Sequence, residues 1–287
     1  MNSVPQMSRQ LRQQLGFTLL GLATTIVVLP ILLLVGYILV QGASAISWEF
    51  ITAMPREGMR AGGIWPALVG TVLLTLGTAI FAVPVGIAVA IYLAEYAHDT
   101  SLTRLIRLAI INLAGVPSVV YGLFGLGLFV IFLRLGTSIL AGSLTLAIMT
   151  LPVIISTAEE ALRAVPQSFR IVSLSLGATQ WQTVRRVVLP QALPGILTGV
   201  ILGLERAAGE TAPILFTVAA FFLPRLPRSI FDQTMALPYH LFVISTQVPG
   251  MPLRIQYGTA LVLLAFVLSM NALATVIRSH FRRRRQW

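Results

Sequence analysis

Three ionisable residues stand together inside a long apolar segment of this 287-residue chain, at Glu205, Arg206 and Glu210. The segment runs from about residue 194 to 220. A charge inside a bilayer costs at least about 2.5 kcal/mol, so such residues generally face a cavity or a partner and mark a functional site. Arg206 and Glu210 are four residues apart and can pair on one helix face. Glu205 points about 100° away, since a helix has about 3.6 residues per turn, and needs its own partner on another helix or chain.

The pair allows three interpretations. The guanidinium of Arg206 has the fork of donors that matches an oxyanion, and an ion pair that loosens can hold an anion transiently. The pair can also gate a path without touching the solute, or only fix helix packing. We place Thr211, which follows Glu210, in the same path, together with the hydroxyl groups of Ser118 and Tyr121. Those hydroxyls can alternatively satisfy nearby backbone carbonyls.

Composition excludes several kinds of chemistry. The chain is 56% apolar and 10% charged, against about a quarter charged in soluble domains, which argues against a water-soluble fold. All 20 basic residues are arginine, so a Walker A phosphate loop and a lysine Schiff base are impossible, and any ATP must be hydrolysed by another chain. Cysteine is absent and the three histidines are far apart in sequence, so we expect no catalytic residue and no metal site on this chain.

Six apolar segments are long enough to span a bilayer, which takes about 20 residues. They cover about 17–40, 67–93, 109–133, 138–158, 194–220 and 259–277. Ala43-Ser44-Ala45 is similar to a signal-peptidase site, but the apolar core before it is longer than the usual signal peptide, so we interpret it as an uncleaved first span. Residues 17–277 therefore form one helical membrane domain between an N-terminal tail, 1–16, and a basic C-terminal tail, 278–287.

Arginines between the spans predict the orientation. One set of compartments holds thirteen and the other holds six. The positive-inside rule then places both termini and the loops at about 94–108 and 159–193 in the cytoplasm. The C-terminal arginine run acts as an orientation anchor or binds anionic lipid heads. The external segments, about 41–66 and 221–258, carry aromatic residues that suit either an interfacial belt or a docking surface for an external partner.

The loop at 159–193 has the signals of short helices outside the membrane. Pro166 favours a helix start, and Gly177 favours a left-handed cap at its end. Thr179 and Gln182 have the spacing of a capping box that begins a second short helix. We expect this second helix to stop before Pro190 and the chain to re-enter the membrane near Pro194.

A second pattern in this loop carries a family resemblance. Gly177 is followed, after nine residues, by Val187-Val188-Leu189-Pro190. This spacing resembles the cytoplasmic EAA loop of binding-protein-dependent ABC importer permeases. The letters that name the loop fall at Ile171-Val172-Ser173, so the acidic residue is missing here and any ionic contact from it is absent. The resemblance implies that the loop docks in a groove on an ATPase subunit. The residues it assigns to this coupling are Leu176, Gly177, Ala178, Thr179, Val187, Leu189 and Pro190.

Three further stretches, 84–96, 114–125 and 206–216, are similar to phosphate ABC importer permeases of the PstA type. The resemblance implies an all-α polytopic membrane protein, a six-transmembrane-helix bundle of the type I ABC importer permease kind, in the bacterial inner membrane. It implies a paired permease of the PstC type, two ATPase subunits of the PstB type that hold ATP and Mg, and an external phosphate-binding protein of the PstS type. No cofactor is expected on this chain.

Two other functions stay open. A permease for another oxyanion would share every feature above. A proton-coupled secondary transporter would use Glu205 or Glu210 as a proton carrier, and inverted repeats would be expected, none of which we recognise in the sequence. An intramembrane hydrolase is disfavoured because no histidine lies in a predicted span.

Overall fold

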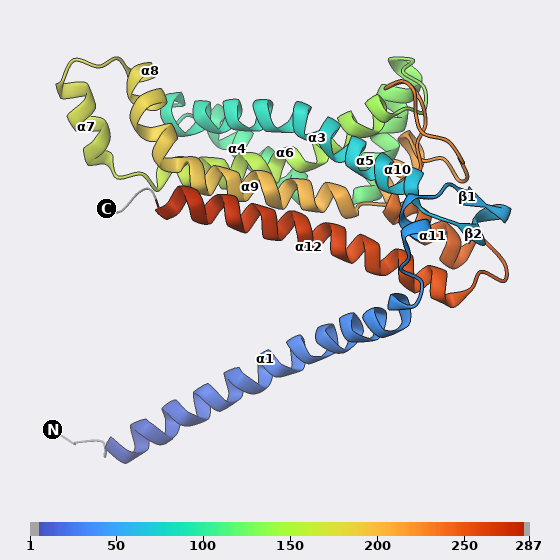
Figure 1. The fold of residues 1–287 in the computed structure, drawn as a ribbon. Helices are drawn as coiled ribbons and strands as arrows, with labels where there is room; N and C mark the ends of the chain where they lie inside the picture. Colours follow the sequence, from blue (N-terminus) through green and yellow to red (C-terminus); the bar gives the residue numbers. More distant parts are fainter. Residues whose placement is uncertain (1–5, 284–287) are drawn as a thin grey trace.

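The computed structural model describes residues 6–283, and nearly all of its regular structure is helical (Figure 1). Three long helices, α3 (Trp65–Ile91), α6 (Ile139–Arg163) and α9 (Leu189–Gly209), pack along one another, and α12 (Leu253–Arg283) packs along α9. Their apolar side chains suit lipid, and a helix satisfies its own backbone hydrogen bonds, which a bilayer core requires. Small residues allow close approach: a Cβ on Gly199 would lie 2.6 Å from the Cβ of Thr157.

Helix α1 (Gln6–Ala43) leaves this bundle at an angle and packs chiefly against α12 (Figure 1). The two helices cross where Gly42 meets the backbone of Tyr257. The rings of Tyr37 and Tyr257 pack edge to face there, with centroids 5.5 Å apart. Within the candidate span Gln13–Ala43 the most apolar stretch is not buried against the rest of the chain.

The third predicted span, 109–133, is broken rather than straight. It consists of α4 (Ser101–Ala114) and α5 (Ser118–Gly125), which continues as a π-helical turn, η3 (Leu126–Phe132). The two parts meet at an angle of 103°. The bend falls at Gly115-Val116-Pro117, where proline lacks the N–H that would continue the first helix. The predicted span 109–133 therefore consists of two helical pieces rather than one helix.

The fifth span also differs from its prediction. A single helical span runs from Gln180 to Gly209, through α8 (Gln180–Thr183), the π-helical η4 (Val184–Val188) and α9. The expected stop before Pro190 is wrong because the N–H of Leu189 bonds to the carbonyl of Val184, five residues back, so a wider turn precedes the proline. The expected continuation to residue 220 is also wrong. Glu210 is extended, and α10 (Ala212–Thr217) is a separate short helix.

Within residues 6–283, five unbroken helices and the bent pair give up to six membrane spans, in agreement with the predicted number. The connections α7 (Gln167–Ser175) and α8 lie at the same end of the molecule as the start of α1 and the end of α12 (Figure 1). We call this the α7–α8 end. Residues 284–287 of the predicted basic tail and residues 1–5 of the predicted N-terminal tail lie outside the described residues.

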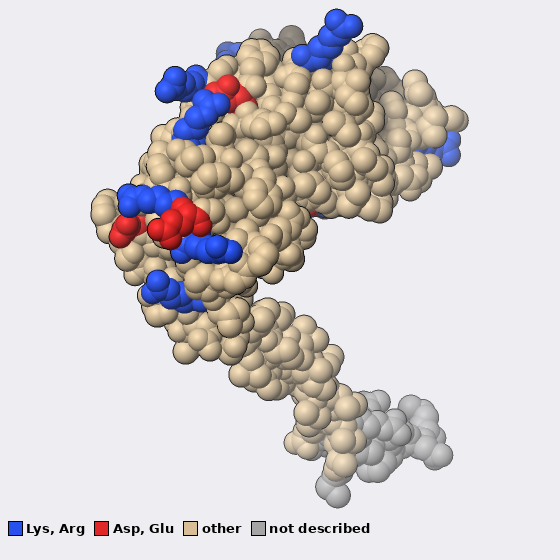
Figure 2. Space-filling view, turned by 90° about the vertical axis from the view of Figure 1, so that its right-hand side faces the viewer, with Lys and Arg blue, Asp and Glu red and all other residues tan. Residues whose placement is uncertain are grey.

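The opposite end, the α11 end, carries the longer loops and α11 (Leu237–Thr246). Here α2 (Trp48–Thr52) precedes a small antiparallel pair, β1 (Pro55–Arg56) and β2 (Ala61–Gly62), joined by the 3-10 turn η1 (Glu57–Met59). Figure 2 looks onto this end: charged side chains form small groups, and uncharged surface covers most of the face and the projecting helix α1.

The loop before α11 covers the start of α6. The carboxylate of Asp232 accepts the backbone N–H groups of Arg228 and Ser229, at 2.8 and 3.2 Å. The Arg228 hydrogen bond is the main cause that lowers the pKa of Asp232. The carbonyl of Asp232 in turn accepts the N–H of Ile139, which satisfies an N–H at the first turn of α6.

Candidate functional site

Arg206 and Glu210 form the ion pair that their spacing predicts. The Nε of Arg206 lies 3.5 Å from Oε1 of Glu210, and the two side chains are 36% and 17% exposed. Arg206 is in the last turn of α9, and Glu210 is the residue that ends it. A cation is favoured at a helix C-terminus, where the backbone carbonyls are unpaired. The separation is long for a charge-assisted bond, so the contact is loose.

The second carboxylate of this group turns toward α12. The Nδ2 of Asn271 donates to Oε2 of Glu205 over 3.4 Å. The other oxygen of Glu205 is buried and has no hydrogen-bond partner among the described residues. Thr198 and Thr275 line the same hollow between α9 and α12. Asn271 is thus one hydrogen-bond partner of Glu205 on another helix of this chain, and a partner on a second chain stays a prediction.

The three hydroxyl residues do not join this ion pair. The hydroxyl of Tyr121 donates to the carbonyl of Leu113 over 2.8 Å, across the bend between α4 and α5. Ser118 begins α5, and Thr211 stands between α9 and α10, both half-buried. No hydrogen bond among the described residues connects Ser118 or Thr211 to Arg206. The assignment of these three hydroxyls to a substrate path stays a prediction, and the observed contact of Tyr121 is the backbone alternative.

Close packing brings the Tyr121 region and the Thr211 region together. A Cβ on Gly122 would lie 3.0 Å from the carbonyl oxygen of Ala212 and 2.8 Å from the ring of Phe216, so α5 and α10 touch through this glycine. Gly125 meets Thr145 of α6 in the same way. These glycines serve helix packing, and the elements that carry the residues predicted for a substrate path are neighbours.

The signals predicted for the loop at 159–193 appear in the structure as local turns. Gly177 has φ of 83°, the left-handed conformation expected of a helix cap, and its N–H bonds to the carbonyl of Leu174. Thr179 and Gln182 form both bonds of the capping box, at 3.2 and 2.9 Å. Helix α7 begins directly after Pro166. These three sequence predictions are confirmed.

The residues assigned to coupling fall into two groups. Leu176 is 83% exposed, and Gly177 and Thr179 are exposed beside it. Val187, Leu189 and Pro190 are half-buried in the continuous helix. Four further large apolar side chains around the turn are exposed, those of Ile171, Val172, Leu174 and Trp181. Together these side chains give the loop an exposed apolar surface, the kind that can bind a protein partner or a membrane.

Sequence reasoning missed a buried ion pair beneath this loop. Arg170 of α7 lies against Glu95, in the π-helical turn η2 (Tyr92–Tyr96) that ends α3. The side chains are 12% and 7% exposed. Glu95 lies within the 84–96 stretch, and an acid at the end of an apolar span was the available signal. Its partner is 75 residues away in sequence, so the spacing rules for one helix do not find it.

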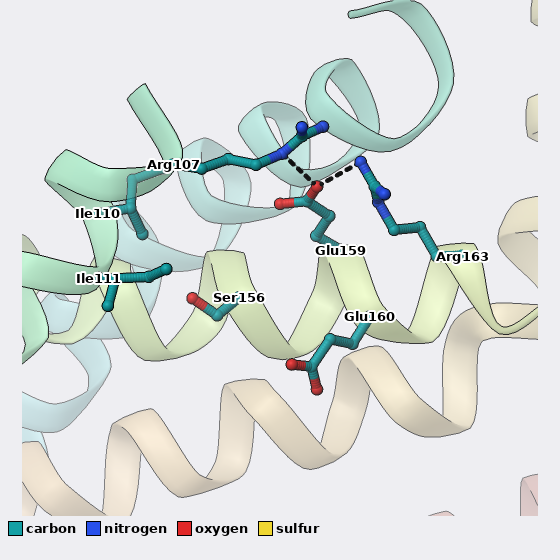
Figure 3. A pocket seen from close by; sticks show the side chains of 7 residues that line it. All are labelled: Arg107, Ile110, Ile111, Ser156, Glu159, Glu160 and Arg163. Atoms are coloured by element: carbon teal, nitrogen blue, oxygen red, sulfur yellow. Dashed lines mark hydrogen bonds and ion pairs between the residues drawn. The ribbon is translucent and has the colours of Figure 1, made fainter. Parts of the chain in front are cut away.

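A second ionic contact ties α4 to α6 at the same end (Figure 3). The Nε of Arg107 and a terminal nitrogen of Arg163 both lie 3.0 Å from Oε1 of Glu159. Glu160, the next residue, points away from them (Figure 3). Arg107 also donates to the carbonyl of Leu93 in η2. Among the described residues no three acidic or histidine side chains are grouped to hold a metal ion.

The comparisons with known proteins agree with this architecture. Residues 82–287 match the family of binding-protein-dependent transport system inner membrane components. This chain belongs to that family. It is therefore the permease component of an ABC importer. Members of this family are integral inner-membrane transport subunits.

Several curated relatives are similar over most of their length. The chain is 33% identical to the probable ABC transporter permease protein YqgI of Bacillus subtilis, over 94% of this chain and 98% of the relative. It is 32% identical to the phosphate transport system permease protein PstA 1 of Mycobacterium tuberculosis, over 97% and 91%. The PstA protein of Xylella fastidiosa is 34% identical, over 83% of each chain.

Two solved ABC importers share the fold. The inward-facing MetNI methionine transporter matches with a TM-score of 0.62 at 18% identity, over 75% of this chain and 94% of that one. A bacterial transporter involved in the import of the acidic polysaccharide alginate matches with a TM-score of 0.63 at 15% identity, over 95% and 99%. These neighbours place the fold among the type I importer permeases, as the sequence resemblance implied.

Proposed function

We propose that this permease carries inorganic phosphate as one membrane subunit of an ATP-driven importer. The observation that carries the proposal is the similarity to PstA proteins at 32% to 35% identity over most of the chain. Its partners in this scheme are a PstC-type permease, two PstB-type ATPase subunits and an external PstS-type phosphate-binding protein. ATP and Mg are held by the ATPase subunits.

The continuous helix from Gln180 to Gly209 gives this proposal a mechanical basis. Its first residues belong to the loop that carries the exposed apolar cluster, and its last turn carries Arg206. Because α8, η4 and α9 form one continuous helical span, ATPase closure that displaces the loop is carried along this span to the ion pair. The loose Arg206–Glu210 contact then opens or closes as the spans rearrange. Phosphate is released because the arginine returns to its carboxylate.

The charge distribution supports an orientation with the α7–α8 end in the cytoplasm. The compartments on that side carry thirteen arginines, against six on the other. Both termini are cytoplasmic in this scheme. The α11 end then faces the external binding protein, and ATP closure converts an inward-open bundle into one that accepts phosphate from that side.

The first test is purification of the tagged chain from its native membrane in mild detergent, followed by mass spectrometry. Recovery of a second permease and an ATPase with a Walker A motif is expected. The complex is then reconstituted into vesicles with its binding protein, where ATP-dependent uptake of radiolabelled phosphate is expected to survive excess sulfate or molybdate.

Other outcomes point elsewhere. Competition by sulfate or molybdate would identify a permease for another oxyanion. A chain recovered alone, with uptake that follows the proton gradient and ignores ATP, would identify a secondary transporter and contradict the proposal.

A further inference from the structure

The hydrogen bonds at the α7–α8 end converge on η2, the last turn of α3. Arg170 makes two parallel bonds to Glu95, Nε to Oε2 at 3.1 Å and Nη2 to Oε1 at 2.6 Å. The same guanidinium donates to the carbonyl of Val165 at 2.6 Å and to that of Leu162 at 2.9 Å. Arg170 therefore joins α7, the end of α3 and the end of α6 in one contact.

The part of the loop that follows Gly177 is hydrogen-bonded to the same turn, η2. The Nε2 of Gln180, the first residue of α8, donates to the backbone carbonyl of Glu95 at 2.6 Å. Arg170 precedes Gly177 in the chain, and Gln180 follows it. Both sides of the loop are thus bonded to one residue of η2.

This contact is strong and specific in geometry. Bidentate bonds between arginine and a carboxylate are charge-assisted and hold one relative orientation. Both side chains are almost fully buried, so separating them would leave an uncompensated charge away from water. A displacement of the loop consequently takes the end of α3 with it.

The buried Arg170–Glu95 pair that holds η2 is distinct from the apolar side chains that face outward. Leu176 and Trp181 are exposed, while Arg170 points under the loop to Glu95. Docking of a partner and transmission of its movement therefore depend on different side chains, and an experiment can separate them.

Helix α3 reaches the far end of the molecule. It packs along α6 and α9, and at its other end Thr71 accepts the backbone N–H of Leu237, the first residue of α11, at 2.8 Å. Gly70 lies under the backbone of Met235 there. Helix α3 therefore connects η2 with the α11 end through contacts of its own.

We propose that Arg170, Glu95 and Gln180 form a clamp that makes α3 move with the loop, so that ATPase closure drives α3 and α9 together. They are positioning residues, because they act through α3 and do not touch the solute. This inference rests on the proposed function for its substrate. Without the clamp, the ATPase subunits still dock and hydrolyse ATP, and transport per ATP falls.

The test uses the complete complex in vesicles, with phosphate uptake and ATP hydrolysis measured in the same sample. Arg170→Gln and Glu95→Gln are each expected to lower the phosphate carried per ATP by about fivefold or more, within the usual range of coupling between sites. The double variant is expected to lose no more than either single variant, because both act through one contact. The amount of co-purified ATPase should stay at the wild-type level.

Two further variants keep the test decisive. Gln180→Ala leaves the buried pair intact and should lower the ratio by a smaller factor, even if the buried substitutions reduce folding. Arg104→Gln is the matched control: its side chain is exposed on α4 at the same end, and no ion pair among the described residues involves it. It should keep the wild-type ratio.

Three results would overturn the clamp: an unchanged ratio in the Arg170, Glu95 and Gln180 variants, losses that multiply in the double variant, or loss of the ATPase subunits. Failure of the proposed function has a different signature, namely a wild-type complex that hydrolyses ATP without phosphate uptake. In that case stimulation of ATP hydrolysis by the binding protein is the readout, and Arg170→Gln should lose it while Arg104→Gln keeps it.

Discussion

At the scale of single residues, the binding of an oxyanion by Arg206 is the property that a substitution can test most directly. Its 3.5 Å contact with Glu210 satisfies the charge without a tight bond, and the side chain remains 36% exposed. A guanidinium in that state can exchange its carboxylate for another oxyanion, because both offer two oxygens to the same fork of donors.

Arg206→Gln should lower ATP-dependent uptake by about tenfold or more, equivalent to about 1.4 kcal/mol in the barrier, while the complex still assembles. Arg206→Lys keeps the charge and loses the planar fork, so an intermediate rate is expected. Uptake by reconstituted vesicles gives the rate, and co-purification of the partner subunits gives assembly. Wild-type uptake by Arg206→Gln would remove Arg206 from the path.

His240 predicts a dependence of stability on pH. It lies on α11, is 2% exposed, and its Nδ1 has no hydrogen-bond partner among the described residues. Burial lowers its pKa from 6.5 to about 4. Between these values the unfolded chain binds a proton that the folded chain does not, so stability falls as the pH is lowered through this range, by up to about 3 kcal/mol.

His240→Leu removes that proton and should flatten the fall. The melting temperature of the purified complex, measured between pH 7 and about pH 4, tests this: the wild type should lose more on acidification than the variant. Equal losses in both proteins would show that His240 does not contribute.

At the scale of the elements, the loop turn depends on the conformation of Gly177. Its φ of 83° is strained for other residues, although no atom lies within 4 Å of the position a Cβ would take. Gly177→Val should therefore disturb the turn through the backbone alone. Asparagine tolerates this conformation better than other side chains, which makes Gly177→Asn a matched control.

Gly177→Val should reduce the ATPase recovered with the chain several-fold without changing membrane insertion, and Gly177→Asn should reduce it less. Quantitative immunoblotting of the purified complex and of the membrane fraction measures both. Undiminished recovery with valine would contradict the assignment of this turn to coupling.

Local signals predicted local structure well. The Gly177 cap and the Thr179 capping box depend on neighbours within a few residues, and both were predictable from spacing. The helix from Gln180 to Gly209 was predicted as two pieces because Pro190 is ordinarily a terminator. The residue types and spacing before Pro190 do not indicate the π-helical turn. A helix can continue through a proline where the preceding turn widens, as it does before Pro190. That widening depends on tertiary packing rather than on local sequence signals.

At the scale of the whole molecule, the apolar runs in the sequence were sufficient to predict the number of spans. They were not sufficient to predict which spans contact one another. Composition fixes which segments suit a bilayer, whereas the Arg170–Glu95 pair and the Glu205–Asn271 bond join residues 75 and 66 positions apart. Many helix arrangements satisfy the same apolar pattern, so a single sequence does not choose between them. The ion pair of Arg206 was predictable because its partner Glu210 is only four residues away, directly after the last turn of the same helix.

The contact between α1 and α12 is the clearest example of a contact between distant parts of the chain. A Cβ on Gly42 would lie 2.5 Å from the backbone oxygen of Tyr257, so the crossing of α1 and α12 requires glycine. Gly42→Val forces the helices apart at a cost of about 1–3 kcal/mol. The melting temperature of the complex and the yield of assembled permease pair should both fall.

Gly36→Val is the control for this prediction, because it adds the same side chain to the same helix where no atom lies within 4 Å. Any change in helix propensity on replacing glycine by valine is shared by the two variants, so the difference between them measures the crossing. If both lose equally, the contact with Tyr257 does not hold α1 in place. If only Gly42→Val loses assembly, α1 depends on α12 for its position, since α12 is the helix against which it chiefly packs.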